Sequence, residues 1–239
     1  MNQYFLKKEC KELHAFPHIT EFALKKISTI QFGSLKKEAS EFFRFYYVID
    51  GRFDWMIEDQ HHILYPGDLA IILPGQRFGG EKDLLDIGTL SWIHIALPQM
   101  ETNGQIVLDR WSRLTENEGL PIGKIILLNG CPVLSKLKEA GALFQNIYNE
   151  FLNQEIGYYV RINQLVDELF ILIARQLTRQ NNSRRDFPQT FMKLEQSLRK
   201  NLSHQWTVEE MAALVGLDNT TFSEKVNEFE AIAELQDND

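Results

Sequence analysis

The amino-acid sequence predicts an α+β protein in which a β-rich part precedes a helical part. Between about residues 20 and 97, short runs of aromatic and β-branched residues alternate with turn sequences, a pattern typical of a small antiparallel barrel or sandwich. From residue 132 to residue 178, apolar residues recur at helical spacing. Two short helices joined by a tight turn are expected between residues 206 and 229. The expected architecture is therefore an antiparallel β-barrel, a helical hairpin and a small all-α unit.

The strands of the β-rich part are marked by alternation and by their turns. Residues 42–49 (FFRFYYVI) precede Asp50-Gly51, a dipeptide typical of a tight hairpin. Residues 53–58 form the expected return strand, with Phe53, Trp55 and Ile57 on one face. Residues 90–97 alternate well enough for a further strand. Between residues 100 and 129 the pattern is weaker, and predicts a short helix or loop near 111–119 and a closing strand at 124–128.

The composition is that of an ordinary globular protein. The 239 residues suffice for two small domains, with 44% hydrophobic and 24% charged residues. No secretory signal is visible at the start, and no apolar run reaches the length needed to span a membrane. Cys10 and Cys131 do not form a disulfide framework. We therefore expect a cytoplasmic protein with no membrane partner.

Two long helices are expected after the barrel. Pro132 is well placed to open the first, whose apolar residues step by three and four; they are Leu137, Ala140, Phe144, Ile147 and Phe151. The second is expected at about 159–178, and its stretch 165–174 is apolar on more than one face. Such a helix needs partners on most sides. This favours a homodimer paired through the hairpin, the alternative being that both helices pack on the barrel.

A polar segment at 180–189 (QNNSRRDFPQ) predicts a linker. The expected division is a barrel domain at 1–130, a helical hairpin at 131–179, the linker at 180–189 and a small helical domain at 190–239, which begins with a helix at 190–200.

The C-terminal helices carry clear start and stop signals. Thr207 and Glu210 have the spacing of a capping box, and Gly216 is a natural helix stop. Asp218 can begin a second helix, in which Phe222, Val226 and Phe229 share one stripe. These features predict a helix-turn-helix unit.

The motifs resemble those of a known family. Residues 206–212 (WTVEEMA), 214–217 (LVGL) and Phe222-Ser223 resemble the first of two helix-turn-helix units in AraC/XylS-type transcriptional regulators. The β-rich part resembles the cupin-like effector-binding domain of these regulators. The residues on which this resemblance rests are Asp50-Gly51, Pro66-Gly67-Asp68, Pro74-Gly75 and Trp92-Ile93-His94. The resemblance implies a regulator that binds a small effector in its barrel and DNA through its C-terminal part.

Candidate site residues follow from this resemblance and from strand parity. The effector-binding candidates are Arg44, Tyr46, Trp55 and His94, of which Arg44 and Tyr46 share one strand face. The arginine could hold a carboxylate or phosphate, and the aromatic rings could stack on a sugar or ring. The alternative is that Tyr46 and Trp55 are core residues and Arg44 is a surface charge. The DNA-binding candidates are Asn219, Thr220, Thr221, Ser223, Glu224 and Asn227.

Two features depart from the family. Residues 187–239 carry four cationic and ten anionic side chains, a net charge of −6, whereas phosphate contacts need Lys and Arg. The chain also ends about ten residues after Phe229, which leaves no room for the second helix-turn-helix. We therefore expect a truncated regulator with weak or lost DNA binding. One rival is a module that does not bind DNA and modulates an intact regulator.

The other rival is a cupin enzyme, which the histidine pattern disfavours. His61 and His62 are adjacent, so on a strand they point to opposite faces and cannot chelate one ion together. Phe78 stands where metal-dependent cupins place their last histidine. The other histidines, His14, His18, His94 and His204, show no ligand spacing. We expect no catalysis, no metal and no cofactor.

Overall fold

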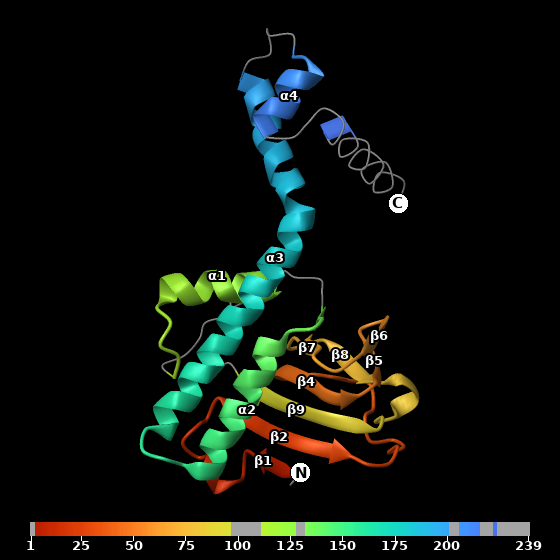
Figure 1. The fold of residues 1–239 in the computed structure, drawn as a ribbon, viewed down its shortest axis with the longest axis vertical. Helices are drawn as coiled ribbons and strands as arrows, with labels where there is room; N and C mark the ends of the chain where they lie inside the picture. The colour runs from red at the N-terminus through yellow and green to blue at the C-terminus, as the bar shows by residue number, and fades with distance from the viewer. Residues whose placement is uncertain (1–2, 97–110, 128–131, 201–205, 216–221, 224–239) are drawn as a thin grey trace. The chain divides into compact units, whose positions relative to one another are not determined.

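A computed structural model describes residues 3–96, 111–127, 132–200, 206–215 and 222–223 of the chain (Figure 1). The chain divides into two compact units, Met1–Thr178 and Arg179–Asp239. The first unit combines antiparallel sheets with helices, which confirms the predicted α+β class. Within the described ranges, no helix has the length and apolar character that crossing a bilayer requires.

Two antiparallel sheets make up the β-rich part. The larger has the order β1-β2-β9-β4-β7-β10, with bounds Tyr4–Lys7, Ile19–Ile27, Gly88–Ile95, Phe43–Gly51, Leu69–Ile72 and Val133–Leu134. The smaller has the order β3-β8-β5-β6, with bounds Glu38–Ala39, Arg77–Gly80, Phe53–Ile57 and Gln60–Leu64. Two 3₁₀ turns, η1 and η2, span Lys11–Leu13 and Glu81–Asp83.

The predicted hairpin across Asp50-Gly51 is wrong, because β4 and β5 belong to different sheets. A register shift in β4 between Val48 and Asp50 precedes Gly51, whose φ is +92°. A Cβ on Gly51 would lie 2.5 Å from the carbonyl oxygen of Ile87. The bulge and this close backbone approach take the chain across to the second sheet, where β5 instead pairs with β6.

The alternating residues of β4 build two separate cores. Its inward side chains, such as Tyr46 and Val48, pack between the two sheets with Trp55 and Phe78. Its outward residues belong to the core beneath the helices; they are Phe43, Phe45 and Tyr47. Phe53, Trp55 and Ile57 of β5 are all buried on one face, as their spacing predicted. One strand therefore contacts the barrel interior and the helical layer at once.

The helices of the first unit are α1 (Glu116–Leu127), α2 (Lys138–Asn153) and the start of α3 (Tyr158–Lys200). Helix α2 and the start of α3 lie over the larger sheet (Figure 1). The five apolar residues predicted to share one stripe, from Leu137 just before α2 to Phe151 within it, are buried there. The closing strand predicted at 124–128 is wrong, since residues up to Leu127 are helical. The strand that closes the sheet is β10, so Pro132 precedes a strand and not a helix.

Helix α3 runs without a break from Tyr158 to Lys200, so the segment 180–189 predicted as a linker is helical. Helix extension is cooperative, because each added residue gains a hydrogen bond once a turn exists, and this outweighs the weak helix preference of the polar segment. The apolar stretch 165–174 is largely buried within the single chain; its most buried members are Leu165, Val166, Leu169, Phe170 and Ile173. Packing on the barrel thus accounts for the apolar faces that suggested a second subunit.

In the second unit, α4 spans Val208–Val215. The predicted capping box is present: the Thr207 amide donates to Oε2 of Glu210 at 3.0 Å, and the Glu210 amide donates to Oγ1 of Thr207 at 3.2 Å. Phe222 is buried, with 4% of its surface exposed. The rest of the predicted second helix lies outside the described residues.

Candidate ligand-binding cavity in the barrel

A cavity of about 720 Å³ opens into the first unit, and all four predicted effector-binding residues line it. That volume lies in the range of pockets for small molecules. Other described residues of its wall include Thr20, Glu21, Leu85, Leu90 and Trp92. Tyr46 and Trp55 belong to the inter-sheet core and also line this wall, so core packing does not exclude contact with the cavity.

Strand register places the polar wall residues in two rows. Glu21 of β2 is opposite His94 of β9, which in turn is opposite Arg44 of β4. In the next row, Trp92 is opposite Tyr46. Side chains directly opposite each other share a sheet face and lie within contact distance. The three strands therefore present a carboxylate, an imidazole and a guanidinium side by side.

These side chains form a connected polar set. Trp92 Nε1 donates a hydrogen bond to Oε1 of Glu21 at 2.5 Å, and Nδ1 of His94 lies 3.8 Å from the same oxygen. Nε2 of His94 and the hydroxyl of Tyr46 are hydrogen-bonded at 3.0 Å. Each of these four side chains is therefore held by a neighbour from another strand.

Burial sets the protonation of this wall. It lowers the pKa of His94 to about 3, helped by the nearby positive charge of Arg44. It raises the pKa of Tyr46 to about 12, against the opposing effect of Arg44. It also raises the pKa of Glu21, against the hydrogen bond from Trp92. His94 and Tyr46 are therefore neutral near pH 7, and Arg44 supplies the permanent charge.

Two donors in the wall lack acceptors. Nε of Arg44 and Nε1 of Trp55 are buried and have no hydrogen-bond partner among the described residues. A buried donor without an acceptor costs about 1–3 kcal/mol. Among the described lining residues, the cations Lys7, Lys8, Lys25 and Arg44 outnumber the anions Glu9 and Glu21. The cavity therefore suits a molecule that brings acceptor oxygens and negative charge.

Glu21 and Trp92 were missed by the sequence interpretation. The signal for Trp92 was present, because it shares strand parity with His94. Nothing in the sequence points to Glu21, because its position in the cavity wall depends on the pairing of β2 with β9. Glu21 and its partner Trp92 are 71 residues apart in the chain.

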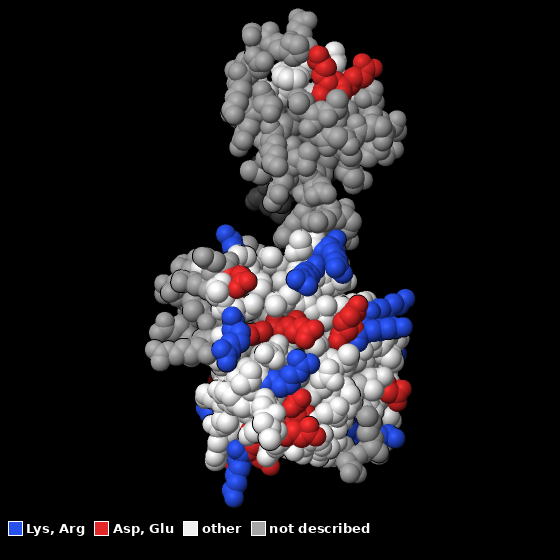
Figure 2. All heavy atoms as spheres, turned by 60° about the vertical axis from the view of Figure 1, so that its left-hand side comes forward, with Lys and Arg blue, Asp and Glu red and all other residues white. Residues whose placement is uncertain are grey.

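Of the predicted DNA-binding residues, Ser223 is described and exposed. The others, Asn219, Thr220, Thr221, Glu224 and Asn227, lie outside the described residues. In α4, Glu209 and Glu210 are both exposed. On the face of the first unit that Figure 2 shows, cationic and anionic side chains are interspersed.

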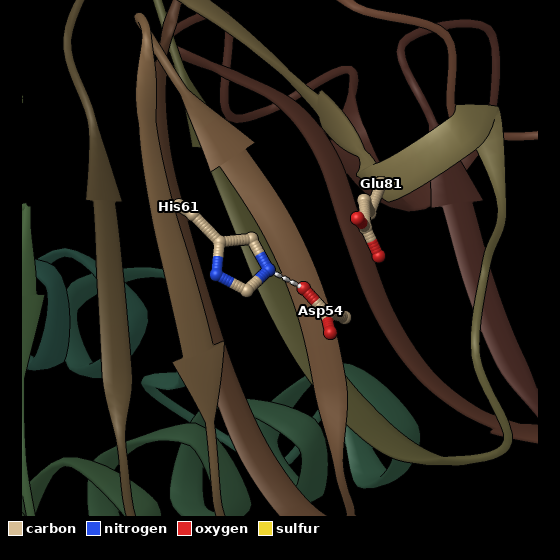
Figure 3. Close-up of side chains that lie close together, drawn as sticks. All are labelled: Asp54, His61 and Glu81. Atoms are coloured by element: carbon tan, nitrogen blue, oxygen red, sulfur yellow. Dashed lines mark hydrogen bonds and ion pairs between the residues drawn. The ribbon is translucent and has the colours of Figure 1, made fainter.

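The adjacent histidines of β6 point to opposite faces, as predicted. His61 is opposite Met56, and His62 is opposite the inward-facing Trp55. On the outer face, His61 lies near Asp54 and Glu81 (Figure 3). This arrangement was not predicted, because strand register and not sequence spacing brings the three residues together.

No family model and no curated protein matches the chain. Among solved structures it is similar to the EutQ protein of Clostridium difficile, with 17% identity and a TM-score of 0.28 over 41% of this chain and 70% of that one. It is also similar to a cupin protein from Bacteroides fragilis, with 14% identity and a TM-score of 0.30 over 45% of this chain and 89% of that one. The AraC-like transcriptional activator CuxR matches 84% of this chain and 67% of its own, at 10% identity and a TM-score of 0.37. Because these TM-scores are all below 0.5, any functional proposal rests on the residues of this chain.

Proposed function

We propose that the chain is an AraC/XylS-type transcriptional regulator whose barrel binds a small anionic effector. The observation that carries the proposal is the convergence of Arg44, Tyr46, Trp55 and His94 on one cavity. Two unpartnered donors, on Arg44 and Trp55, favour a ligand rich in acceptor oxygens, such as a carboxylate or phosphate compound. The capping box at Thr207 and Glu210 and the burial of Phe222 support the helix-turn-helix part.

Strand β4 offers a route from the effector to the helices. Arg44 and Tyr46 face the cavity, whereas Phe45 and Tyr47 face the helical layer. The ring of Phe45 lies 5.4 Å from that of Phe170 in α3, and the ring of Tyr47 lies 5.9 Å from that of Phe144 in α2. A shift of β4 on ligand binding would therefore change helix packing, and the effector would act by favouring one helix arrangement.

A homodimer is part of the proposal. Several large apolar side chains near the turn between α2 and α3 are exposed; they are Leu152, Ile156, Tyr159 and Val160. Exposed apolar groups of this kind favour a protein partner, and a two-fold assembly is what a two-site operator requires.

The proposal assigns no catalysis to the barrel. His94 is the histidine among the described lining residues, and a pKa of about 3 makes it a poor base near pH 7. Zinc, iron or manganese bound within the barrel of the purified protein, together with turnover of a substrate, would contradict this assignment.

The competing function is an effector-binding module that does not bind DNA. The excess of acidic side chains in residues 187–239 and the exposed Glu209 and Glu210 favour it. Binding to promoter fragments at increasing salt separates the two functions. A regulator binds with a steep salt dependence and responds to effector, whereas the module gives no DNA binding even at low salt.

A further inference from the structure

Three possible metal ligands meet on the outer face of the smaller sheet. They are Asp54 of β5, His61 of β6 and Glu81 of η2, and one potential ligand atom from each lies within 4.8 Å of the others. Nε2 of His61 contacts Oδ1 of Asp54, and Glu81 approaches from the neighbouring turn (Figure 3).

The strand pattern dictates this meeting. Because Phe53, Trp55 and Ile57 face the barrel interior, Asp54 between them faces outward. The pairing of His61 with Met56 puts His61 on the same outer face, diagonal to Asp54. Trp55 is opposite Gly80, so the next residue, Glu81, emerges beside Asp54. Two neighbouring strands of the smaller sheet, β5 and β6, and the turn η2 that follows β8 therefore supply the three groups.

We propose that Asp54, His61 and Glu81 bind one divalent transition-metal ion of the Zn²⁺ type. One imidazole nitrogen and two carboxylate oxygens form an established ligand set for such ions, whereas Mg²⁺ and Ca²⁺ prefer oxygen ligands alone. Ligand bonds of about 2.1 Å place the donor atoms of a tetrahedral site roughly 3.4 Å apart. The side chains must adjust to reach that spacing, and His61 has the most room to do so because 45% of its side chain is exposed.

The local charge also favours a cation. A third carboxylate is close, since Oδ2 of Asp86 accepts a hydrogen bond from the Asp54 amide at 2.8 Å. The positive charge of Arg52 opposes the binding of a cation. Its guanidinium, however, lies 3.3 Å from Oδ2 of Asp54, whereas the oxygen that faces His61 is Oδ1. The oxygen needed by the metal is therefore not the one held by Arg52.

This site is separate from the effector cavity. It lies on the opposite face of β5 from Trp55, and none of its three residues lines the cavity. The two are connected through the chain, because Leu85, four residues after Glu81, is part of the cavity wall. A bound ion would hold η2 against β5 and β6 and so stiffen the segment that leads to this wall.

The test uses metal-stripped, tag-free, full-length protein titrated with Zn²⁺, Mg²⁺ and Ca²⁺ by calorimetry, with metal analysis after dialysis. We expect one Zn²⁺ per chain, at least about 10-fold weaker binding in His61→Ala and in Glu81→Gln, and unchanged binding in His62→Ala. At a 100-fold excess over Kd, Zn²⁺ should raise Tm by about 5–10 °C.

The matched control is His62→Ala, because His62 is the sequence neighbour of His61 on the other face of the strand. Circular dichroism checks that each variant is folded. The proposal is overturned if wild-type protein binds no Zn²⁺, if His61→Ala and Glu81→Gln both bind it as wild type does, or if Mg²⁺ binds equally well.

Discussion

The barrel cavity and the C-terminal unit differ in how well their charge suits the partner that each is proposed to bind. Among the described residues of the cavity wall, four cations face two anions, and two buried donors lack acceptors. Residues 187–239 have the opposite balance, with four cations and ten anions, although their proposed partner is a polyanion. The comparison teaches that the charge of the cavity wall suits the anionic ligand proposed for it, whereas the C-terminal unit lacks the excess of positive charge that its proposed partner, DNA, would require.

The largest expected effect is on stability and comes from removing an aromatic side chain packed between β4 and the helices. Phe144 is 1% exposed and stacks on Tyr47. Phe144→Ala should lower the free energy of unfolding of the first unit by about 3–5 kcal/mol, because it leaves a cavity in the core. Denaturant unfolding measures this. Asn146→Ala, at an exposed residue of the same helix, is the control and should change stability little. Equal losses in both variants would refute the packing described for α2.

The next effect tests the charge of the cavity. Arg44→Gln removes the charge beside His94 and Tyr46, and should weaken binding of an anionic ligand by about 2–3 kcal/mol, or roughly 30- to 150-fold. Calorimetry on both proteins measures the change. Arg52→Gln is the matched control, because 58% of that side chain is exposed and it does not line the cavity. Unchanged affinity in Arg44→Gln would place the ligand elsewhere.

The pH dependence of stability sharpens the account of the wall. His94 has a pKa near 3 when folded and an ordinary value of 6.5, so between these values the unfolded chain binds the extra proton and stability falls as pH falls. Lowering the pH from 7 to 5 should therefore cost about 2 kcal/mol through this group. His94→Gln, measured without ligand, should remove this part of the pH dependence; the same slope in both proteins would show that His94 is not buried and neutral.

In the C-terminal unit, removal of the capping box at Thr207 should have a smaller effect on stability. Thr207→Ala removes the side chain that accepts from the Glu210 amide and should destabilise α4 by about 1 kcal/mol. Hydrogen exchange of the α4 amides reports it as faster exchange. Thr207→Ser keeps the hydroxyl and should restore protection; if Ser and Ala behave alike, the hydroxyl is not capping the helix.

The smallest expected effect is on ligand affinity and comes from removing one hydrogen-bond donor, Nε1 of Trp55. Trp55→Phe keeps an aromatic ring but removes Nε1, so it should weaken binding of an acceptor-bearing ligand by about 1 kcal/mol, or roughly 5-fold. Trp111→Phe is the control, because Trp111 is also buried but does not line the cavity. A gain in affinity for Trp55→Phe would mean that the ligand presents apolar groups to this side chain.

The parts of the fold that depend on period-two alternation could be predicted from the sequence. Arg44 and Tyr46 share a face for that reason, and so do Phe53, Trp55 and Ile57. The capping box was likewise local, and its two residues lie three positions apart.

What could not be predicted depends on distant pairing or on cooperativity. Asp50-Gly51 has the sequence of a hairpin turn, but the bulge before it sends β5 into the other sheet. The polar residues at 180–189 resemble a linker, yet they continue a helix that is already formed. Glu21 and the outer group of Asp54, His61 and Glu81 become visible only when strand register is known.

The most direct test of the central claim is a crystal structure of the protein with an anionic ligand selected by thermal shift. The account predicts that carboxylate or phosphate oxygens lie within hydrogen-bond distance of Arg44 Nε and Trp55 Nε1, inside the barrel. A ligand bound outside this cavity, or one that turns apolar atoms toward both donors, would contradict it.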